Sequence, residues 1–76
     1  MQVTVLAIEH EHGTNITVHA SELGAMTVLY EFVEKYWDTM ENPDTPSGDM
    51  KEDIATYFDY YELTESFIMQ TTELQP

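Results

Sequence analysis

Apolar side chains recur at helical spacing through the middle of the chain. The periodic residues are Leu23, Met26, Leu29, Tyr30, Val33, Tyr36, Trp37 and Met40. At 100° per residue these side chains fall in one broad arc, and the acidic side chains of the same stretch fall on the opposite side. Ser21 is a favourable N-cap, and Glu22 suits the first turn. The pattern therefore predicts an amphipathic helix from Ser21 to Met40, which needs a partner layer to cover its apolar side.

Two strand-like stretches precede this helix. Val3–Glu9 is rich in β-branched residues and has apolar side chains on both faces, which is typical of a central strand. Asn15–His19 also alternates, and Gly13 between the two stretches can adopt a positive φ without steric cost. We expect these stretches to form a β-hairpin with its tip near His12 and Gly13.

A turn region with two prolines and one glycine, residues 41–48, follows the helix. Asp49 then stands at the N-cap of a second, shorter helix, and Glu52 has capping-box spacing from it. The apolar face of this helix consists of Met50, Ile54, Tyr57, Phe58 and Tyr61. The predicted outward face consists of Glu52, Asp53, Thr56 and Asp59. The last periodic stretch, Ser66–Leu74, is predicted to be a strand.

The predicted order of elements is β-β-α-α-β in a single domain of 76 residues. The simplest α+β architecture for this order is a three-stranded antiparallel sheet with both helices packed on one face. The last strand would pair with the first, which leaves the second strand as an edge. Because the chain has no cysteine, packing rather than disulfide bonds must stabilise it. Its nine aromatic residues favour a folded chain over a disordered one.

The charge of the chain is strongly one-sided. It has fifteen acidic residues, two lysines and no arginine, so its net charge is −13. Eleven of the acidic residues and both lysines lie between Glu31 and Glu65, which gives this segment −11 + 2 = −9. Glu31 and Lys35 form a favourable pair four residues apart, whereas Glu34 and Asp38 form a repulsive one. Because such repulsion opposes folding, we infer that the acidic segment serves a function.

The same imbalance excludes several classes of partner. Binding to DNA or RNA requires lysine and arginine side chains that displace condensed counterions, and two lysines are too few. Attraction to an anionic membrane is excluded for the same reason. A basic protein surface is the natural electrostatic complement.

Carboxylates three and four residues apart on a helix are about 4.5–6 Å apart along its axis. That spacing resembles one row of DNA phosphates, since duplex DNA presents one charge per about 1.7 Å of axis over both strands. The acidic residues predicted to contact a basic partner are Glu31, Glu34, Asp38, Glu41, Asp44, Glu52, Asp53 and Asp59.

In size, net charge, lack of cysteine and arginine, and acidic helices, the chain resembles the small DNA-mimic inhibitors of phages and mobile elements, which include anti-CRISPR and anti-restriction proteins. The likeness lies in composition and not in a linear motif, so no residue role is transferred. It implies a non-enzymatic inhibitor that occupies the nucleic-acid channel of a CRISPR effector complex, or of another host DNA-binding protein, in the bacterial cytoplasm. The alternative is a small structural or regulatory module that binds a protein partner through an exposed sheet edge.

Other kinds of site have weaker support. His10 and His12 would share one face of a strand, and His19 on the neighbouring strand could supply a third metal ligand. Their place at the end of a strand favours a polar hairpin tip instead, so we expect no metal and no cofactor. The chain has no cysteine nucleophile, phosphate-binding glycine loop or Gly-x-Ser-x-Gly motif, so we expect no enzymatic activity. Five aromatic residues are predicted to lie in the core rather than in a ligand pocket: Tyr36, Trp37, Tyr57, Phe58 and Tyr61. Tyr60 lies off that apolar face and is predicted to contact a partner.

The sequence also lacks signals for export or membrane insertion. The first residues, Met1–Thr4, carry no positive side chain of the kind that opens a signal peptide. No apolar run approaches the roughly 20 residues of a membrane span. We therefore expect a soluble, intracellular protein.

Overall fold

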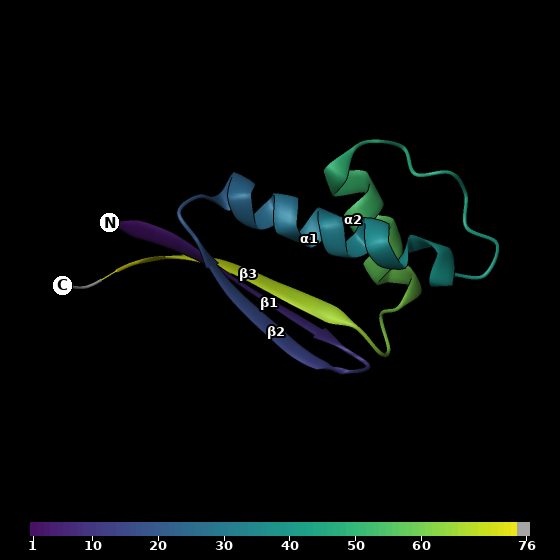
Figure 1. Ribbon diagram of the computed structural model, residues 1–76, viewed down its shortest axis with the longest axis horizontal. Coiled ribbons are helices and arrows are strands. Elements are labelled where there is room, and N and C mark those ends of the chain that lie inside the picture. Colours follow the sequence, from purple (N-terminus) through teal and green to yellow (C-terminus); the bar gives the residue numbers. More distant parts are fainter. Residues whose placement is uncertain (75–76) are drawn as a thin grey trace.

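The computed structural model describes residues 1–74 and contains a three-stranded antiparallel sheet and two helices (Figure 1). The elements are β1 (Gln2–His10), β2 (Gly13–His19), α1 (Glu22–Tyr36), the short 3-10 helix η1 (Trp37–Thr39), α2 (Met50–Tyr60) and β3 (Ser66–Glu73). The predicted α+β class and the order β-β-α-α-β are confirmed. Within residues 1–74, no helix is both long enough and apolar enough to cross a bilayer.

β1 lies at the centre of the sheet, because the strand order is β2-β1-β3. β1 pairs with β2 through a hairpin in which His10 lies opposite Gly13. Gly13 has a φ of +128°, a conformation that favours glycine over any residue with a Cβ atom. β3 runs antiparallel along the other side of β1, from Ser66 opposite Glu9 to Glu73 opposite Gln2. The predicted central strand, hairpin and edge position of β2 are therefore confirmed.

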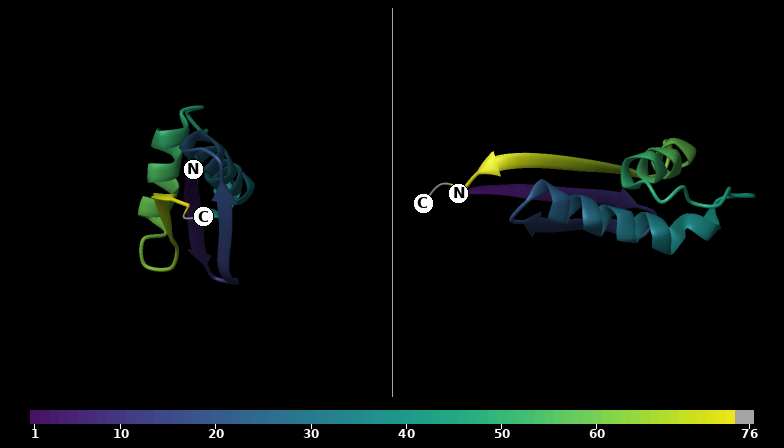
Figure 2. Two further views of the ribbon diagram at one scale, coloured as in Figure 1. Left: turned by 90° about the vertical axis from the view of Figure 1, so that its left-hand side faces the viewer. Right: turned by 90° about the horizontal axis from the view of Figure 1, so that it is seen from above.

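Both helices cover the same face of the sheet (Figures 1 and 2). α1 buries Ala25, Leu29 and Val33 completely, in one core with Leu6 and Ile8 of β1. α2 packs on the β3 side, where the rings of Phe58 and Phe67 have centroids 4.9 Å apart. In the part of the chain that the structure describes, no helix covers the opposite face of the sheet.

The ends of the helices follow the sequence closely. The Ser21 Oγ atom accepts a hydrogen bond from the Gly24 N–H at 3.1 Å, and Asp49 Oδ1 accepts one from the Glu52 N–H at 3.0 Å, so both predicted N-caps are confirmed. The predicted single helix to Met40 tightens into η1 for its last turn. The assignment of Leu23 to the apolar face is wrong: its side chain is 67% exposed, because the buried line of α1 runs through residues 25, 29 and 33.

The carboxylate of Asp53 is buried within the helical layer and has only 2% of its surface exposed. Oδ1 accepts hydrogen bonds from the Ser47 N–H at 2.9 Å and the Ser47 O–H at 2.8 Å. Oδ2 accepts hydrogen bonds from the Tyr30 O–H at 2.7 Å and the Gly48 N–H at 3.2 Å. The expectation that Asp53 faces outward is therefore wrong, because its place on α2 turns it towards α1 and the 41–49 connection, where four donors compensate its burial.

The same contacts set the ionisation of Asp53. Burial raises the pKa of this carboxyl, but hydrogen bonds from Ser47, Tyr30 and Gly48 outweigh that effect and hold the pKa below its usual value of 3.8. In turn, the hydrogen bond to Asp53, followed by burial and by the charge of Asp53, raises the pKa of Tyr30 to about 12. The carboxylate is thus ionised at neutral pH and ties three segments of the chain together.

Substitution of Asp53→Ala removes all four hydrogen bonds, and we expect it to lower the free energy of unfolding by roughly 2–4 kcal/mol. The matched control is Asp59→Ala, an exposed carboxylate on the same helix, which should change stability by less than about 0.5 kcal/mol. Urea unfolding followed by circular dichroism at pH 7 measures both. Equal stability of the two variants would contradict the role of Asp53.

The contribution of Asp53 should also depend on pH. Because its folded-state pKa lies below 3.8, the stabilisation is fully present above that pH and is lost as the pH falls through the folded-state pKa. We therefore expect the difference in stability between the wild type and Asp53→Ala to shrink in acid. A difference that stays constant down to about pH 2 would show that the ionised carboxylate is not responsible.

Candidate functional site

The carboxylates of this protein are concentrated on the helical layer. Twelve of the fifteen acidic residues lie on α1, η1, α2 and their connections, between Glu22 and Glu65. The remaining three, Glu9, Glu11 and Glu73, belong to the strands and the hairpin turn. Of the twelve, only Asp53 is buried and only Glu65 is half-buried, so ten exposed carboxylates are available to a partner.

No lysine neutralises this surface within residues 1–74. The favourable pairing predicted for Glu31 and Lys35 does not form; the Lys35 ammonium instead lies 5.3 Å from the centroid of the Tyr36 ring. The ion pair found among the described residues joins the N-terminal ammonium to Glu73 at 2.7 Å, on the sheet. The helical layer therefore keeps a large negative potential, because its two lysines are far outnumbered by carboxylates and pair with none of them among residues 1–74; solvent ions screen the rest.

The structure places seven of the eight predicted contact residues at exposed positions. Glu31 and Glu34 lie on the outer side of α1, Asp38 on η1, Glu41 and Asp44 on the connection, and Glu52 and Asp59 on α2. The exception is the buried Asp53, which is satisfied by its four donors and is therefore not available to a partner. Three of the seven, Glu41, Asp44 and Asp59, come together around one cavity of about 260 Å³.

Two hydrogen bonds hold the connection against the helices at this cavity. The indole Nε1 of Trp37 donates to the Asp44 carbonyl oxygen at 2.8 Å, and the Tyr60 hydroxyl accepts from the Glu41 N–H at 3.0 Å. Between them, Asn42 turns the chain with a φ of +50°. The carboxylates of this cavity are therefore carried by an anchored backbone rather than by a free loop.

Tyr60 gives the cavity an aromatic surface. Its side chain is 50% exposed and lines the same cavity as the three carboxylates. A ring beside carboxylates attracts ammonium and guanidinium groups, since the ring face adds cation–π attraction to the charge. The assignment of Tyr60 as a contact residue stays a prediction, and the structure places it where such a contact is possible.

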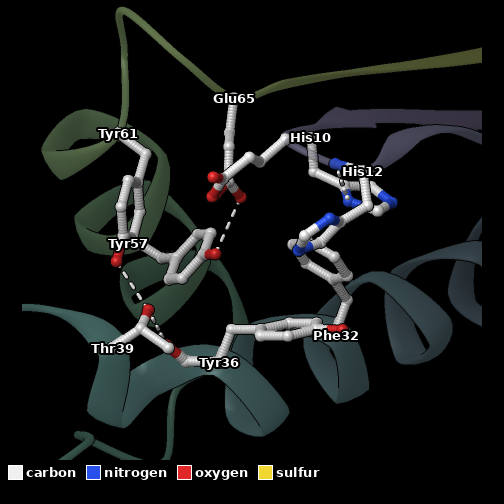
Figure 3. A pocket seen from close by; sticks show the side chains of 9 residues that line it. His10, His12, Phe32, Tyr36, Thr39, Tyr57, Tyr61 and Glu65 are labelled. Carbon is white, nitrogen blue, oxygen red and sulfur yellow. Dashed lines mark hydrogen bonds between the residues drawn. The ribbon is translucent and has the colours of Figure 1, made fainter.

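A second cavity, of about 170 Å³, lies between the hairpin tip and the two helices (Figure 3). Its walls are mainly aromatic, and the residues that line it include His10, Phe32, Tyr36, Tyr57, Tyr61 and Glu65. It is smaller than the roughly 300–1,000 Å³ of pockets that hold drug-sized ligands. Its volume suits a few waters or one small side chain, and we assign it no separate function.

The side chain of Tyr57 ties α2 to the segment before β3 at this cavity. Its hydroxyl donates to Glu65 Oε1 at 2.8 Å, as Figure 3 shows, and its ring is 1% exposed. Burial first, and then the hydrogen bond to Glu65, raises the pKa of the Tyr57 hydroxyl above its usual value of 10.0. The prediction that Tyr57 belongs to the core is confirmed, whereas Phe32, Tyr36 and Tyr61 are half-buried around the cavity.

The variant Tyr57→Phe keeps the buried ring but removes the donor to Glu65. We expect it to lower the free energy of unfolding by about 1 kcal/mol, the usual net value of one hydrogen bond. Tyr36→Phe is the matched control, because the Tyr36 hydroxyl makes no hydrogen bond to another side chain within residues 1–74. Chemical unfolding of the two variants tests this, and equal stabilities would show that the Tyr57–Glu65 contact contributes nothing.

The three histidines do not come together to form a metal site. His10 lies opposite Gly13, whereas His19 lies opposite Thr4 at the other end of β2, so the idea that His19 approaches the other two is wrong. The ring centroids of His10 and His12 are 6.1 Å apart. His10 Nδ1 accepts a hydrogen bond from the backbone N–H of His12 at 3.3 Å. Among residues 1–74, no group of three or more histidine, aspartate or glutamate side chains is placed to hold a metal ion.

Comparison with known proteins finds no matching family model, no matching curated protein and no matching solved structure. The acidic surface is therefore interpreted from its own chemistry.

Proposed function

We propose that this protein is an acidic inhibitor that occupies the basic nucleic-acid-binding surface of a CRISPR effector complex or a similar host DNA-binding protein. The observation that supports the proposal is the concentration of exposed carboxylates on the helical layer, with neither lysine paired among residues 1–74. The residues assigned to the contact are Glu31, Glu34, Asp38, Glu41, Asp44, Glu52 and Asp59.

The physical basis of the proposal is competition for the same cations. A groove that binds DNA carries lysine and arginine side chains, and neutralising phosphates with them releases condensed counterions. An acidic protein surface of similar charge density attracts the same side chains and accelerates encounter by electrostatic steering. DNA and this protein would then exclude each other from the groove.

Rigidity of the acidic surface favours such a role over that of a solvated tail. The carboxylates of α1 project from a helix that is anchored in the core by the completely buried Ala25, Leu29 and Val33. Glu41 and Asp44 lie on a backbone fixed by Trp37 and Tyr60. Because the carriers are ordered before binding, little conformational entropy is lost when a partner is engaged. The exposed ring of Tyr60 adds a surface on which an arginine side chain can stack.

The decisive variant reverses three charges, Glu34→Lys, Asp38→Lys and Glu41→Lys. We expect it to lose at least roughly 100-fold in its ability to displace labelled duplex DNA from a purified CRISPR effector complex, measured by fluorescence anisotropy. The control reverses Glu9, Glu11 and Glu73, the three carboxylates outside the helical layer, which changes the net charge by the same amount away from the proposed contact. Circular dichroism of both variants checks that the fold is retained.

Inhibition by the wild type should also weaken steeply as salt rises, because exposed charges drive the association. If both triple variants lose inhibition to the same extent, net charge matters but the position of the charges does not, which would contradict the assignment of this surface. If the wild type displaces DNA from none of the CRISPR effector complexes in a panel, the proposal is rejected for that class of target.

The second candidate function is a structural or regulatory module that binds a protein partner through a sheet edge. It is favoured by the composition of the two edge strands: β2 has no carboxylate and β3 has only Glu73. Pairing of backbone groups along such an edge would be largely insensitive to salt. The salt titration above therefore distinguishes it from an acidic interface.

A further inference from the structure

The face of the sheet turned away from the helices carries a cluster of apolar side chains, three of them exposed on the edge strands and two half-buried on β1. Ala7 at the centre of β1 lies between Ile16 of β2 and Ile68 of β3, and Val5 lies opposite Val18. Ile16, Val18 and Ile68 are 67%, 63% and 64% exposed. We call these five residues the open-face cluster.

The open-face cluster is continuous, because its members are direct cross-strand neighbours. Residues paired across an antiparallel ladder have Cβ atoms about 4.5–5.5 Å apart, so their side chains touch. Scattered apolar residues on a protein surface need no explanation, but a contiguous patch commonly marks an interaction site. Here the patch spans all three strands of the sheet.

The near absence of charged side chains on this face indicates which partner can pack against it. By the strand register, the residues on it are Val3, Val5, Ala7, Glu9, Thr14, Ile16, Val18, Ser66, Ile68, Gln70 and Thr72, and Glu9 is the only charged one. The helical layer, in contrast, carries twelve carboxylates. Two copies of a chain with net charge −13 can meet here while each brings a single carboxylate to the contact.

We propose that two copies of this chain associate through their open-face clusters, with the helical layers outside. Flat faces rich in β-branched side chains pack about 10 Å apart in β-sandwiches, and a two-fold axis lets the same patch serve both copies. The dimer would display its acidic surfaces in opposite directions. This proposal stands independently of the target assigned to the acidic surface.

The size of the face indicates a weak dimer. Three strands of 7–9 residues cover about 25 Å by 15 Å, or about 400 Å² per copy, against about 800 Å² per partner in a standard interface. Repulsion between two acidic molecules weakens the dimer further at low ionic strength. We therefore expect a dissociation constant in the micromolar range that becomes smaller as salt rises, the opposite of the salt effect expected for a basic target.

Sedimentation equilibrium over protein concentrations of about 10–500 μM, at about 50 mM and 500 mM NaCl, tests the proposal. The wild type should dimerise, and more strongly at the higher salt. The double variant Ile16→Thr, Ile68→Thr keeps β-branched residues in the strands and should dimerise at least about tenfold more weakly. Leu23→Thr, Leu63→Thr is the matched control, since these leucines are 67% and 94% exposed outside the face and should leave dimerisation unchanged.

Three outcomes would overturn the proposal. The first is a wild type that stays monomeric at the highest protein and salt concentrations, which would leave the face to a different partner. The second is a dimer that the open-face variant does not weaken, as edge-to-edge pairing of strands would give. The third is equal weakening by the control variant. If circular dichroism shows that the double variant is unfolded, the single variant Val18→Thr replaces it in the same sedimentation experiment and should also weaken dimerisation.

Discussion

The arrangement of the helical layer depends on one buried carboxylate. Asp53 accepts hydrogen bonds from Tyr30 on α1 and from Ser47 and Gly48 before α2, so it joins both helices to their connection. Because the chain has no cysteine, no disulfide bond can fix the connection between the helices, which contains two prolines. The hydrogen bonds to Asp53 fix its path instead. The exposed carboxylates of that connection, Glu41 and Asp44, keep their places because Tyr60 and Trp37 anchor their backbone and Asp53 holds the end of the same connection.

Charge divides the molecule into two sides with different physical behaviour. The helical side carries nearly all the acidic residues and interacts through long-range forces that salt weakens. The open side of the sheet carries one carboxylate and interacts through apolar contact, which salt does not weaken. The two proposed contacts, with a cationic partner and with a second copy of the chain, therefore do not conflict, because they would use opposite faces.

Hydrophobic periodicity was sufficient to predict the elements, their order and the central position of β1, and the capping residues Ser21 and Asp49 predicted both N-caps. It failed where contacts between elements distant in sequence determine the direction of a side chain. On a helical wheel Asp53 lies at the margin of the polar side, and only the approach of Tyr30 and Ser47 shows that it points inward. Alternation in β1 indicated apolar side chains on both faces, and the order β-β-α-α-β correctly predicted that both helices pack on one of them. The meeting of Glu41, Asp44 and Asp59 depends on the path of the connection, which no local pattern encodes.

The central position of β1 also has a consequence for how the chain acquires its structure. β1 precedes the other described elements in the chain, yet one of its two neighbours is β3, which follows all of them, with Gln2 opposite Glu73. The hairpin and α1 can associate early through local contacts, whereas the second ladder must wait until β3 has been synthesised. During that interval one backbone edge of β1 lacks its partner, so the nascent chain is most exposed to mispairing just before its last strand arrives.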